Sequence, residues 1–369
     1  MMTRRQFITT AAATGLGATG VLTFHSFSKG RSDYEQAVQQ IWRHGEPGSS
    51  DAPAVLRELV RYATLAPSSH NTQCWKFGLG DQSVSILPDY QRRCPIVDPD
   101  DHHLFVSLGC AAENLVQAAS AVGLRGEAVF NTGKKESLDI SLARTTKLRT
   151  PLFEAIPRRQ STRGEFDAKP LSNNELKLLE TAGSGNDVRV HLLTNQQAME
   201  NVLDFVIQGN TAQMRDSAFV RELKDWLRFN GGQAVRQGDG LFSGSSGNPT
   251  APGWLGGLLF DWFFTEKAEN DKYARQVRSS AGIAVFVSDF EDKKHWIETG
   301  RAFQRFALQA TAMDVRTAHL NQPVEVASLR PQFAKSIGMT SGRPDLVIRF
   351  GRGPEMPRSL RRPVEAVII

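Results

Sequence analysis

Two short polar segments of the chain carry residue types suited to binding a phosphorylated, planar ligand. Arg159 and Arg163 flank a hydroxyl at Ser161, and two guanidinium groups with one hydroxyl suit a phosphate. Residues 67–71, about ninety positions earlier, read Pro-Ser-Ser-His-Asn. The hydroxyls, amide and loop N–H groups of this segment suit the polar edge of a heterocycle. Taken alone, the arginine run is typical of a solvated basic turn before a helix, and residues 67–71 are typical of a loop with helix-cap residues.

Other reactive residue types do not form a recognisable centre. Three cysteines are present: Cys74, Cys94 and Cys110. Their spacing matches neither a metal site nor a disulfide framework. Residues 100–103 read Asp-Asp-His-His, which we interpret as helix capping and solvation rather than metal binding. The sequence therefore predicts no metal and no catalytic side chain, and any difficult chemistry would belong to a cofactor.

The composition is that of an ordinary globular chain. It has 369 residues, a hydrophobic fraction of 40% and a net charge of +5, enough for one large core or two moderate ones. Basic residues gather near the C-terminus: Arg343, Arg349, Arg352, Arg358, Arg361 and Arg362. No aromatic-and-basic platform accompanies them, so we expect no nucleic acid partner. A cofactor that carries a phosphate is the more economical partner.

The N-terminus resembles a twin-arginine export signal. Residues 3–8 read Thr-Arg-Arg-Gln-Phe-Ile, and residues 9–24 are uncharged and rich in Ala, Gly and Thr. This stretch is shorter than the ~20 apolar residues that a membrane span needs. The pattern predicts export by the twin-arginine translocation machinery to the periplasm or the outer face of the membrane. Since no clean Ala-x-Ala site precedes Asp33, a retained signal that tethers the protein to the membrane stays open.

An internal duplication is visible in the elements that position the polar segments. Residues 109–124 align without gaps on residues 300–315, and their Gly, Ala and apolar positions recur with helical spacing. The alternative is that two alanine-rich core helices coincide by composition. We favour duplication and predict an α+β fold of two repeats.

The predicted elements divide the chain into three parts. Residues 1–30 form the signal segment, residues 31–150 repeat one, and residues 151–369 repeat two. For repeat one we expect helices over 54–65 and 104–122 and strands over 75–79, 83–88 and 126–130. For repeat two we expect helices over 173–181, 197–210 and 296–313 and strands over 188–193, 281–287 and 346–351.

Repeat two contains an insertion over about 211–277. A Gly/Ser-rich stretch over 238–257 leads into an aromatic cluster: Trp254, Phe260, Trp262, Phe263 and Phe264. Long insertions in compact domains often form lids or binding loops. We predict a lid over the ligand. The alternatives are an arm that packs on the other repeat and an aromatic patch that meets a membrane.

The two polar segments, now taken with their neighbours, resemble motifs of the FMN-dependent nitroreductase family. The matching stretches are 66–75 and 158–163, in inverted order, with 93–100, 342–346 and 361–365. As an ordered set they resemble the duplicated, single-chain Acg-type branch. The resemblance implies a nitroreductase-like FMN-binding α+β fold, in which two pseudo-symmetric repeats of one chain imitate the usual homodimer.

The resemblance also implies one composite FMN site per chain, built from both repeats. The implied phosphate ligands are Arg159, Ser161, Arg163, Arg361 and, with less support, Arg362. The implied contacts to the isoalloxazine and ribityl groups are Pro67, Ser68, Ser69 and Asn71, and Leu320 and Asn321 would lie near flavin N5.

Two functions follow from the resemblance. One is an FMN-dependent oxidoreductase that takes hydride from NAD(P)H and reduces a nitroaromatic, a quinone or a similar small-molecule acceptor. The alternative is a non-catalytic protein that binds and sequesters FMN under a closed lid. NAD(P)H is not expected in the periplasm, so an exported enzyme would need another donor. A protein without flavin would instead point to a membrane-tethered interaction protein.

Overall fold

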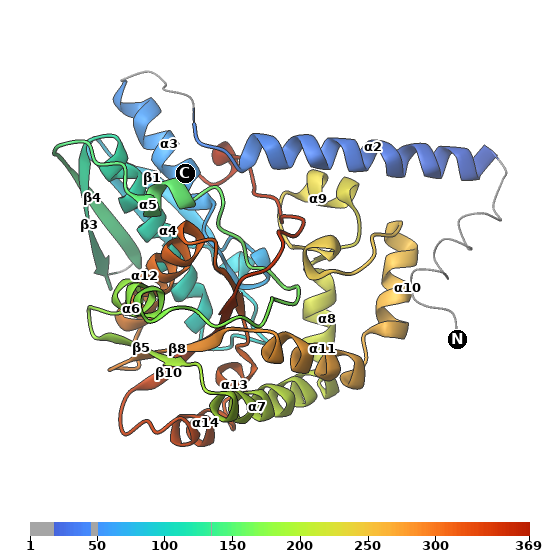
Figure 1. The fold of residues 1–369 in the computed structure, drawn as a ribbon. Helices are drawn as coiled ribbons and strands as arrows, with labels where there is room; N and C mark the ends of the chain where they lie inside the picture. The colour runs from blue at the N-terminus through green and yellow to red at the C-terminus, as the bar shows by residue number, and fades with distance from the viewer. Residues whose placement is uncertain (1–17, 46–50, 134) are drawn as a thin grey trace.

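The structure is a computed structural model that describes residues 18–45, 51–133 and 135–369, with no side-chain description for 18–28. The twin-arginine motif and the first part of the uncharged stretch lie outside the described residues. The first described element is the long helix α2 (Ala18–Ile41), which extends along one edge of the molecule (Figure 1). Its second half packs on α9 (Gly231–Gln237).

The first half of the chain forms a four-stranded antiparallel sheet with a long helix between its second and third strands. Its elements are α3 (Ala52–Thr64), β1 (Trp75–Leu79), β2 (Ser83–Pro88), α4 (His102–Ala121), β3 (Leu124–Asn131) and β4 (Ser137–Arg144). The strand order is β1-β2-β4-β3. The burial of β4 alternates along the strand, as expected for a sheet with one face on the core.

The second half repeats this arrangement. Its corresponding elements are α6 (Asn173–Gly183), β5 (Val188–Leu193), β8 (Gly282–Ser288), α12 (Lys293–Ala312), β9 (Arg316–His319) and β10 (Arg343–Gly351). The strand order β5-β8-β10-β9 matches the first sheet position by position, with α12 in the place of α4. The predicted fold of two pseudo-symmetric α+β repeats is confirmed.

The two repeats meet where α4 crosses α12 (Figure 1). A Cβ atom built on Gly109 would lie 2.0 Å from the carbonyl oxygen of Ile297, and one built on Gly300 would lie 2.0 Å from that of Val106. Each glycine therefore touches the residue three positions before the other glycine. Gly109 and Gly300 are the positions that the sequence alignment paired, so the contact is related by the pseudo-twofold symmetry.

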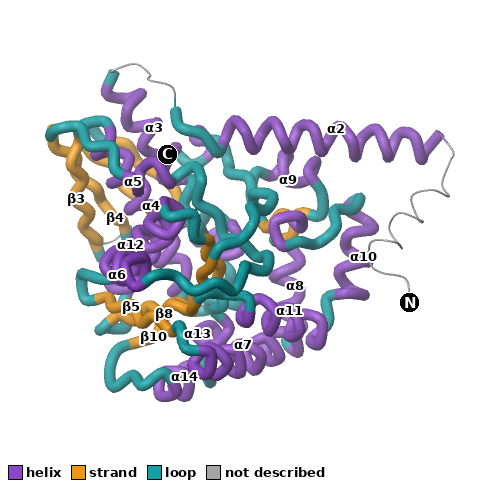
Figure 2. The backbone as a smooth tube through the Cα atoms, in the orientation of Figure 1, coloured by secondary structure: helices purple, strands orange, loops and turns teal. Residues whose placement is uncertain are grey.

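The main core gathers around this crossing. Side chains of α3, α4 and α12 and of both sheets form one continuous buried cluster, and strands β3 and β4 of the first sheet lie at the left edge of the molecule (Figure 2). Among the described helices, α4 alone is long and apolar enough to span a membrane, but most of its residues are buried within the protein. This composition is that of a central core helix.

The insertion contains helices and short strands that were not predicted from the sequence. It extends from the end of α7 (Gln196–Arg215) and contains α8 (Ser217–Asp225), β6 (Leu227–Arg228), α9, β7 (Leu241–Phe242), α10 (Gly253–Phe263) and α11 (Glu266–Arg278). Three short helices complete the described α-helices: α5 (Pro151–Ala155), α13 (Gln322–Glu325) and α14 (Arg330–Ser336).

Replacing Gly109 with Ala tests the helix crossing. Helix propensity alone favours Ala over Gly by about 1 kcal/mol, but the added methyl group would overlap a backbone oxygen that cannot move independently. We expect Gly109→Ala and Gly300→Ala each to lower the free energy of unfolding by about 1–3 kcal/mol in urea titrations.

Gly257→Ala is the matched control, because this helical glycine has only ordinary contact space, 3.7 Å to a lysine side chain. We expect it to be neutral or slightly stabilising. Equal effects at positions 109 and 257 would contradict the packing argument.

Candidate functional site

A cavity of about 300 Å³ lies between the two repeats and the insertion. Repeat one contributes the loop residues Pro67, Ser68, Ser69 and His70, and repeat two contributes Arg163, His319 and Asn321. The insertion supplies an apolar wall that includes Leu259, Phe260, Phe263 and Phe264. The volume and the mixture of an apolar wall with a few polar groups are typical of a small-molecule site.

The structure brings five of the eleven predicted site residues to this cavity: Pro67, Ser68, Ser69, Arg163 and Asn321. The other six do not line it. Leu320 is fully buried and its N–H donates to the carbonyl of Val347 (2.7 Å), so this N–H is committed to the sheet. Ser161 makes a bridge to Thr317 in β9. The remaining four residues, Arg159, Asn71, Arg361 and Arg362, make hydrogen bonds in or next to the loop that carries Ser68 and Ser69.

Those four residues hold in place the loop of residues 66–71, which we call the serine loop. Arg361 donates to the carbonyls of Thr64, Leu65 and Ala66 and to Oδ1 of Asn71 (2.7–3.3 Å). Arg159 donates to the same Leu65 carbonyl (3.0 Å).

The loop is also tied to the insertion and to the C-terminal segment. The amide of Asn71 donates to the carbonyls of Gly240 and Leu360. The N–H of Arg362 donates to the side chain of Gln73 (2.8 Å). In this structure these residues position the loop that carries Ser68 and Ser69.

Several buried arginines lie beside the cavity without a direct ion-pair partner, although Glu269 and Glu325 also line the cavity. Among the described residues, Arg159, Arg163, Arg349 and Arg361 have no carboxylate within ion-pair distance. Burial lowers the pKa of Arg159 to about 10 and that of Arg349 to about 9. The Nε atoms of both are buried without a hydrogen-bond partner. Burying cations without partners costs free energy, and a bound anion would recover it.

Arg163 is the member of this group that faces the cavity. No described residue accepts a hydrogen bond from its guanidinium, whereas its carbonyl accepts one from Gln276 (2.6 Å). Burial lowers its pKa. Its neighbour Arg349 donates to the carbonyls of Thr162 and Gly164 (3.0 and 2.7 Å), which fixes the backbone on both sides of Arg163.

Two histidines of the cavity are held neutral. Burial, followed by the charge of Arg163, lowers the pKa of His70 to about 4 and that of His319 to about 3. His319 also packs edge-to-face on Phe303, with ring centroids 4.9 Å apart. Neither histidine therefore adds to the positive charge at neutral pH.

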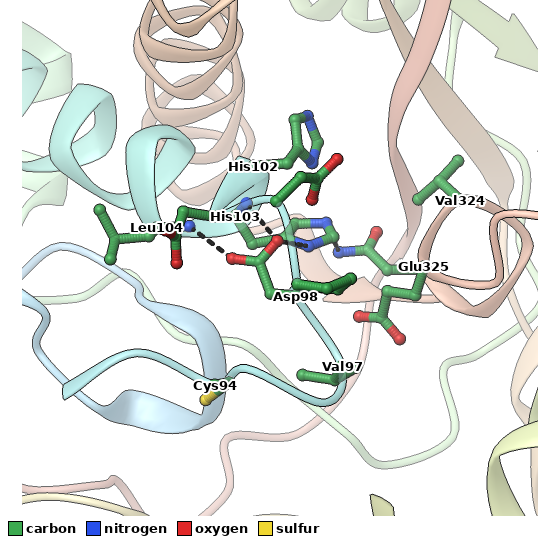
Figure 3. Close-up of polar contacts among 12 residues, drawn as sticks. Cys94, Val97, Asp98, His102, His103, Leu104, Val324 and Glu325 are labelled. Atoms are coloured by element: carbon green, nitrogen blue, oxygen red, sulfur yellow. Dashed lines mark hydrogen bonds and ion pairs between the residues drawn. The ribbon is translucent and has the colours of Figure 1, made fainter. Parts of the chain in front are cut away.

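A third histidine, His103, reaches the cavity from the start of α4. Asp98 accepts hydrogen bonds from the N–H groups of His103 and Leu104 (both 3.0 Å) and lies 3.5 Å from Nδ1 of His103 (Figure 3). The amide of Asn321 lies 3.3 Å from Nε2 of the same ring. The predicted capping and solvation by residues 100–103 is wrong in its residues: Asp101 makes no side-chain capping hydrogen bond, His102 and His103 are buried, and Asp98 caps the helix instead. The adjacent histidines at 102 and 103 were the available sequence signal for His103.

Two groups of side chains have ligand atoms close enough to hold a metal ion: Asp98, His102 and His103, and His70, Cys94 and Glu222. Existing hydrogen bonds use most of these atoms. His102 bonds to the buried carboxylate of Asp345 (2.9 Å), and Glu222 accepts the N–H groups of Ile96 and Val97 (both 3.0 Å). These contacts are structural links between segments.

The donor set fits a phosphorylated heterocycle. Arg163 offers an unpaired cation, the buried arginines around it supply a positive field, and Ser68, Ser69 and Asn321 offer neutral polar groups. The apolar wall of the insertion would cover a planar ring system. The arrangement can bind and shield such a ligand, and the described cavity residues include no pair placed as nucleophile and base.

The chain is similar in sequence to two proteins of Mycobacterium tuberculosis (strain ATCC 25618 / H37Rv) that are provisionally named as NAD(P)H nitroreductases. One is 25% identical over 324 residues, which is 85% of this chain and 90% of the relative. The other, called acg, is 22% identical over 327 residues, 85% of this chain and 95% of the relative. This similarity extends over most of all three chains. No family model matches the chain.

Solved structures give weaker matches. The FMN-dependent nitroreductase NfnB of Mycobacterium smegmatis, in complex with NADPH, is 11% identical with a TM-score of 0.39, covering 58% of this chain and 96% of that one. A nitroreductase of Desulfitobacterium hafniense DCB-2 with bound FMN is 14% identical with a TM-score of 0.38, covering 58% and 96%.

The neutral histidines predict a specific dependence of stability on pH. Because the folded pKa of His319 lies below its unfolded value near 6.5, the unfolded chain binds more protons and the free energy of unfolding falls as pH drops from 7 towards 4. Each such histidine accounts for up to about 2 kcal/mol between pH 7 and 5. His319→Gln should reduce this loss by up to that amount in urea titrations without ligand.

His191→Gln, on the exposed side of β5, is the control and should leave most of the pH dependence in place. An unchanged pH dependence in His319→Gln would show that His319 is protonated in the folded protein.

Proposed function

We propose that the protein binds one FMN in this cavity and works as a nitroreductase-type oxidoreductase. A bound FMN would supply hydride transfer between a reduced donor and a small-molecule acceptor. The protein would supply the binding groups, the orientation and the exclusion of water. The relatives in Mycobacterium tuberculosis, provisionally named as NAD(P)H nitroreductases, support this class of activity.

The observation that carries the proposal is the unpaired guanidinium of Arg163 at the junction of the two repeats. A guanidinium that lacks a carboxylate partner and lies in a field of further arginines is suited to a phosphate dianion. Arg159 and Arg349 would strengthen this attraction from outside the cavity lining, because neither of them has an ion-pair partner among the described residues.

The remaining cavity residues suit the rest of the cofactor. The hydroxyls of Ser68 and Ser69 and the amide of Asn321 can meet the polar edge of the ring system and the ribityl chain. Arg361 and Asn71 would contribute to FMN binding indirectly, because they fix the backbone of the serine loop. NAD(P)H is the proposed donor, or another reductant if the protein is exported, and a nitroaromatic or quinone is the proposed acceptor.

Sequestration of FMN without turnover is the alternative, and the wall of the insertion favours it. Phe260 and Phe264 stack with ring centroids 4.4 Å apart and line the cavity with Leu259 and Phe263. A wall of this kind covers the space in which a donor and an acceptor would stack on a flavin. The two functions share the same binding residues and differ only in whether α10 and α11 open.

We also propose that the protein is exported in its folded form by the twin-arginine machinery and acts at the periplasmic side of the membrane. The support is the Arg4–Arg5 pair and the uncharged stretch that follows it. Because one chain supplies both repeats, no second subunit is needed to complete the site.

Arg163→Gln separates ligand binding from stability. Removal of the guanidinium should weaken FMN binding at least tenfold, because a hydrogen bond to a charged group contributes about 1.5–3 kcal/mol. The same change should leave the flavin-free protein equally stable or more stable, since it removes a cation whose pKa burial lowers. Bound FMN per chain and urea titration of the flavin-free protein measure the two effects.

Arg158→Gln is the matched control. Its side chain is about half exposed and pairs with Asp314 at 3.5 Å, so both quantities should stay unchanged. Full FMN retention by Arg163→Gln would place the phosphate elsewhere.

Anaerobic addition of NADPH to the flavin-loaded protein distinguishes the two functions. Bleaching of the flavin absorbance followed by reoxidation with a nitroaromatic or quinone supports the oxidoreductase. A flavin that also stays oxidised with menaquinol or dithionite as donor supports sequestration.

A further inference from the structure

Helix α10 is apolar on both of its faces although it lies at the surface. Its inward face lines the cavity with Gly256, Leu259 and Phe260. Its outward face exposes Trp254, Leu258 and Trp262, spaced four residues apart, with 70%, 47% and 67% of their surface accessible. A surface helix of a globular protein normally presents polar residues outward. The outer face of α10 lacks the polar residues that are expected there.

The next helix shows the normal pattern in the same surroundings. Helix α11 also lines the cavity, through Glu269, Lys272 and Tyr273. Its exposed positions include Lys267 and Asp271, which pair with each other at 3.0 Å. The apolar outer face is therefore a property of α10 and not a requirement of covering the cavity.

We propose that the outer face of α10 docks on the surface of an anionic lipid bilayer. Tryptophan and leucine on one face of a surface helix are typical of helices that lie in the membrane interface, where indole rings are enriched. The one charged residue of α10, Asp261, is already paired with Lys224 (2.7 Å). Docking would therefore not bury an unpaired charge, and the net charge of +5 favours an anionic surface.

The position of the start of α2 supports the same partner. The uncharged stretch over 9–24 includes the first residues of α2, and the start of α2 and helix α10 both lie on the right of the molecule in Figure 1. One weak membrane contact gives only marginal, reversible binding, and stable attachment usually needs two. Here α10 would be the second contact.

A second copy of the chain fits this face less well. The outer face of α10 offers mainly the three side chains of Trp254, Leu258 and Trp262, whereas a stable interface buries about 800 Å² and 20–30 residues on each partner. A bilayer surface has no such minimum, because a few interfacial aromatic side chains are sufficient to add to an existing anchor.

The test uses the full chain with vesicles of phosphatidylethanolamine and phosphatidylglycerol that contain brominated acyl chains. Of the six tryptophans, Trp254 and Trp262 alone are highly exposed, so bromine should quench their fluorescence on binding. In W254S/W262S we expect this quenching to be lost and vesicle binding to fall at least tenfold. Phe290→Ser removes an apolar side chain that is 58% exposed on another element and should behave as the unchanged protein does.

Three results would overturn the proposal. The first is that the unchanged chain does not bind the vesicles, or binds without tryptophan quenching, which would restrict contact to the N-terminal segment. The second is that W254S/W262S binds as tightly as the unchanged chain. The third is a lipid-free dimer at micromolar concentration that W254S/W262S converts to monomer, which would assign the face to a second copy. Because the assay contains no donor or acceptor, its outcome is independent of the proposed flavin chemistry.

Discussion

The close approach of α4 and α12 is the constraint on which the rest of the structure depends. Two glycines let the helix backbones touch, and any side chain there would push the repeats apart. Polar contacts fix the register of the crossing: Gln304 donates to Asn114 (2.6 Å), which donates in turn to the carbonyl of Tyr62 (2.9 Å). Since the cavity takes residues from both repeats, its geometry follows from this one interface.

The arginines around the cavity are buried under different conditions from the residues of the core. A core buries apolar groups that need no partner, whereas Arg159, Arg163 and Arg349 are held near one another without a carboxylate among the described residues. Backbone carbonyls accept hydrogen bonds from Arg159 and Arg349 but do not cancel their charge. A protein that gives up stability in this way concentrates a strong electrostatic potential on one small volume, which is the property that an anion site requires.

Much of the fold could be predicted from the sequence because its signals are local. Strands β1, β2 and β5 were predicted with the observed bounds, and α3, α4, α6 and α12 within three residues at each end. Strand β4 was missed although its burial alternates, and α10 was missed because a Gly-rich sequence has low helix propensity.

The site was harder to predict, since Arg361 and Asn71 meet across 290 residues. The residue types alone indicated that Arg361 and Asn71 make polar contacts near the site. Only the folded chain shows that Arg361 and Asn71 bond to each other, and that the N–H of Leu320 donates a hydrogen bond within the sheet.

The C-terminal segment gives this molecule an unusual order of assembly. Phe77 in β1 donates to the carbonyl of Val367 and accepts from the N–H of Ile369, and Arg361 holds the serine loop near residue 66. The first sheet and the serine loop therefore lack these contacts until residues nearly 300 positions later have been synthesised. During synthesis on the ribosome, repeat one would emerge with an open strand edge and an unanchored loop. The cavity becomes complete only when the end of the chain folds back across the first repeat, so that closing the polypeptide path and forming the binding site are a single event.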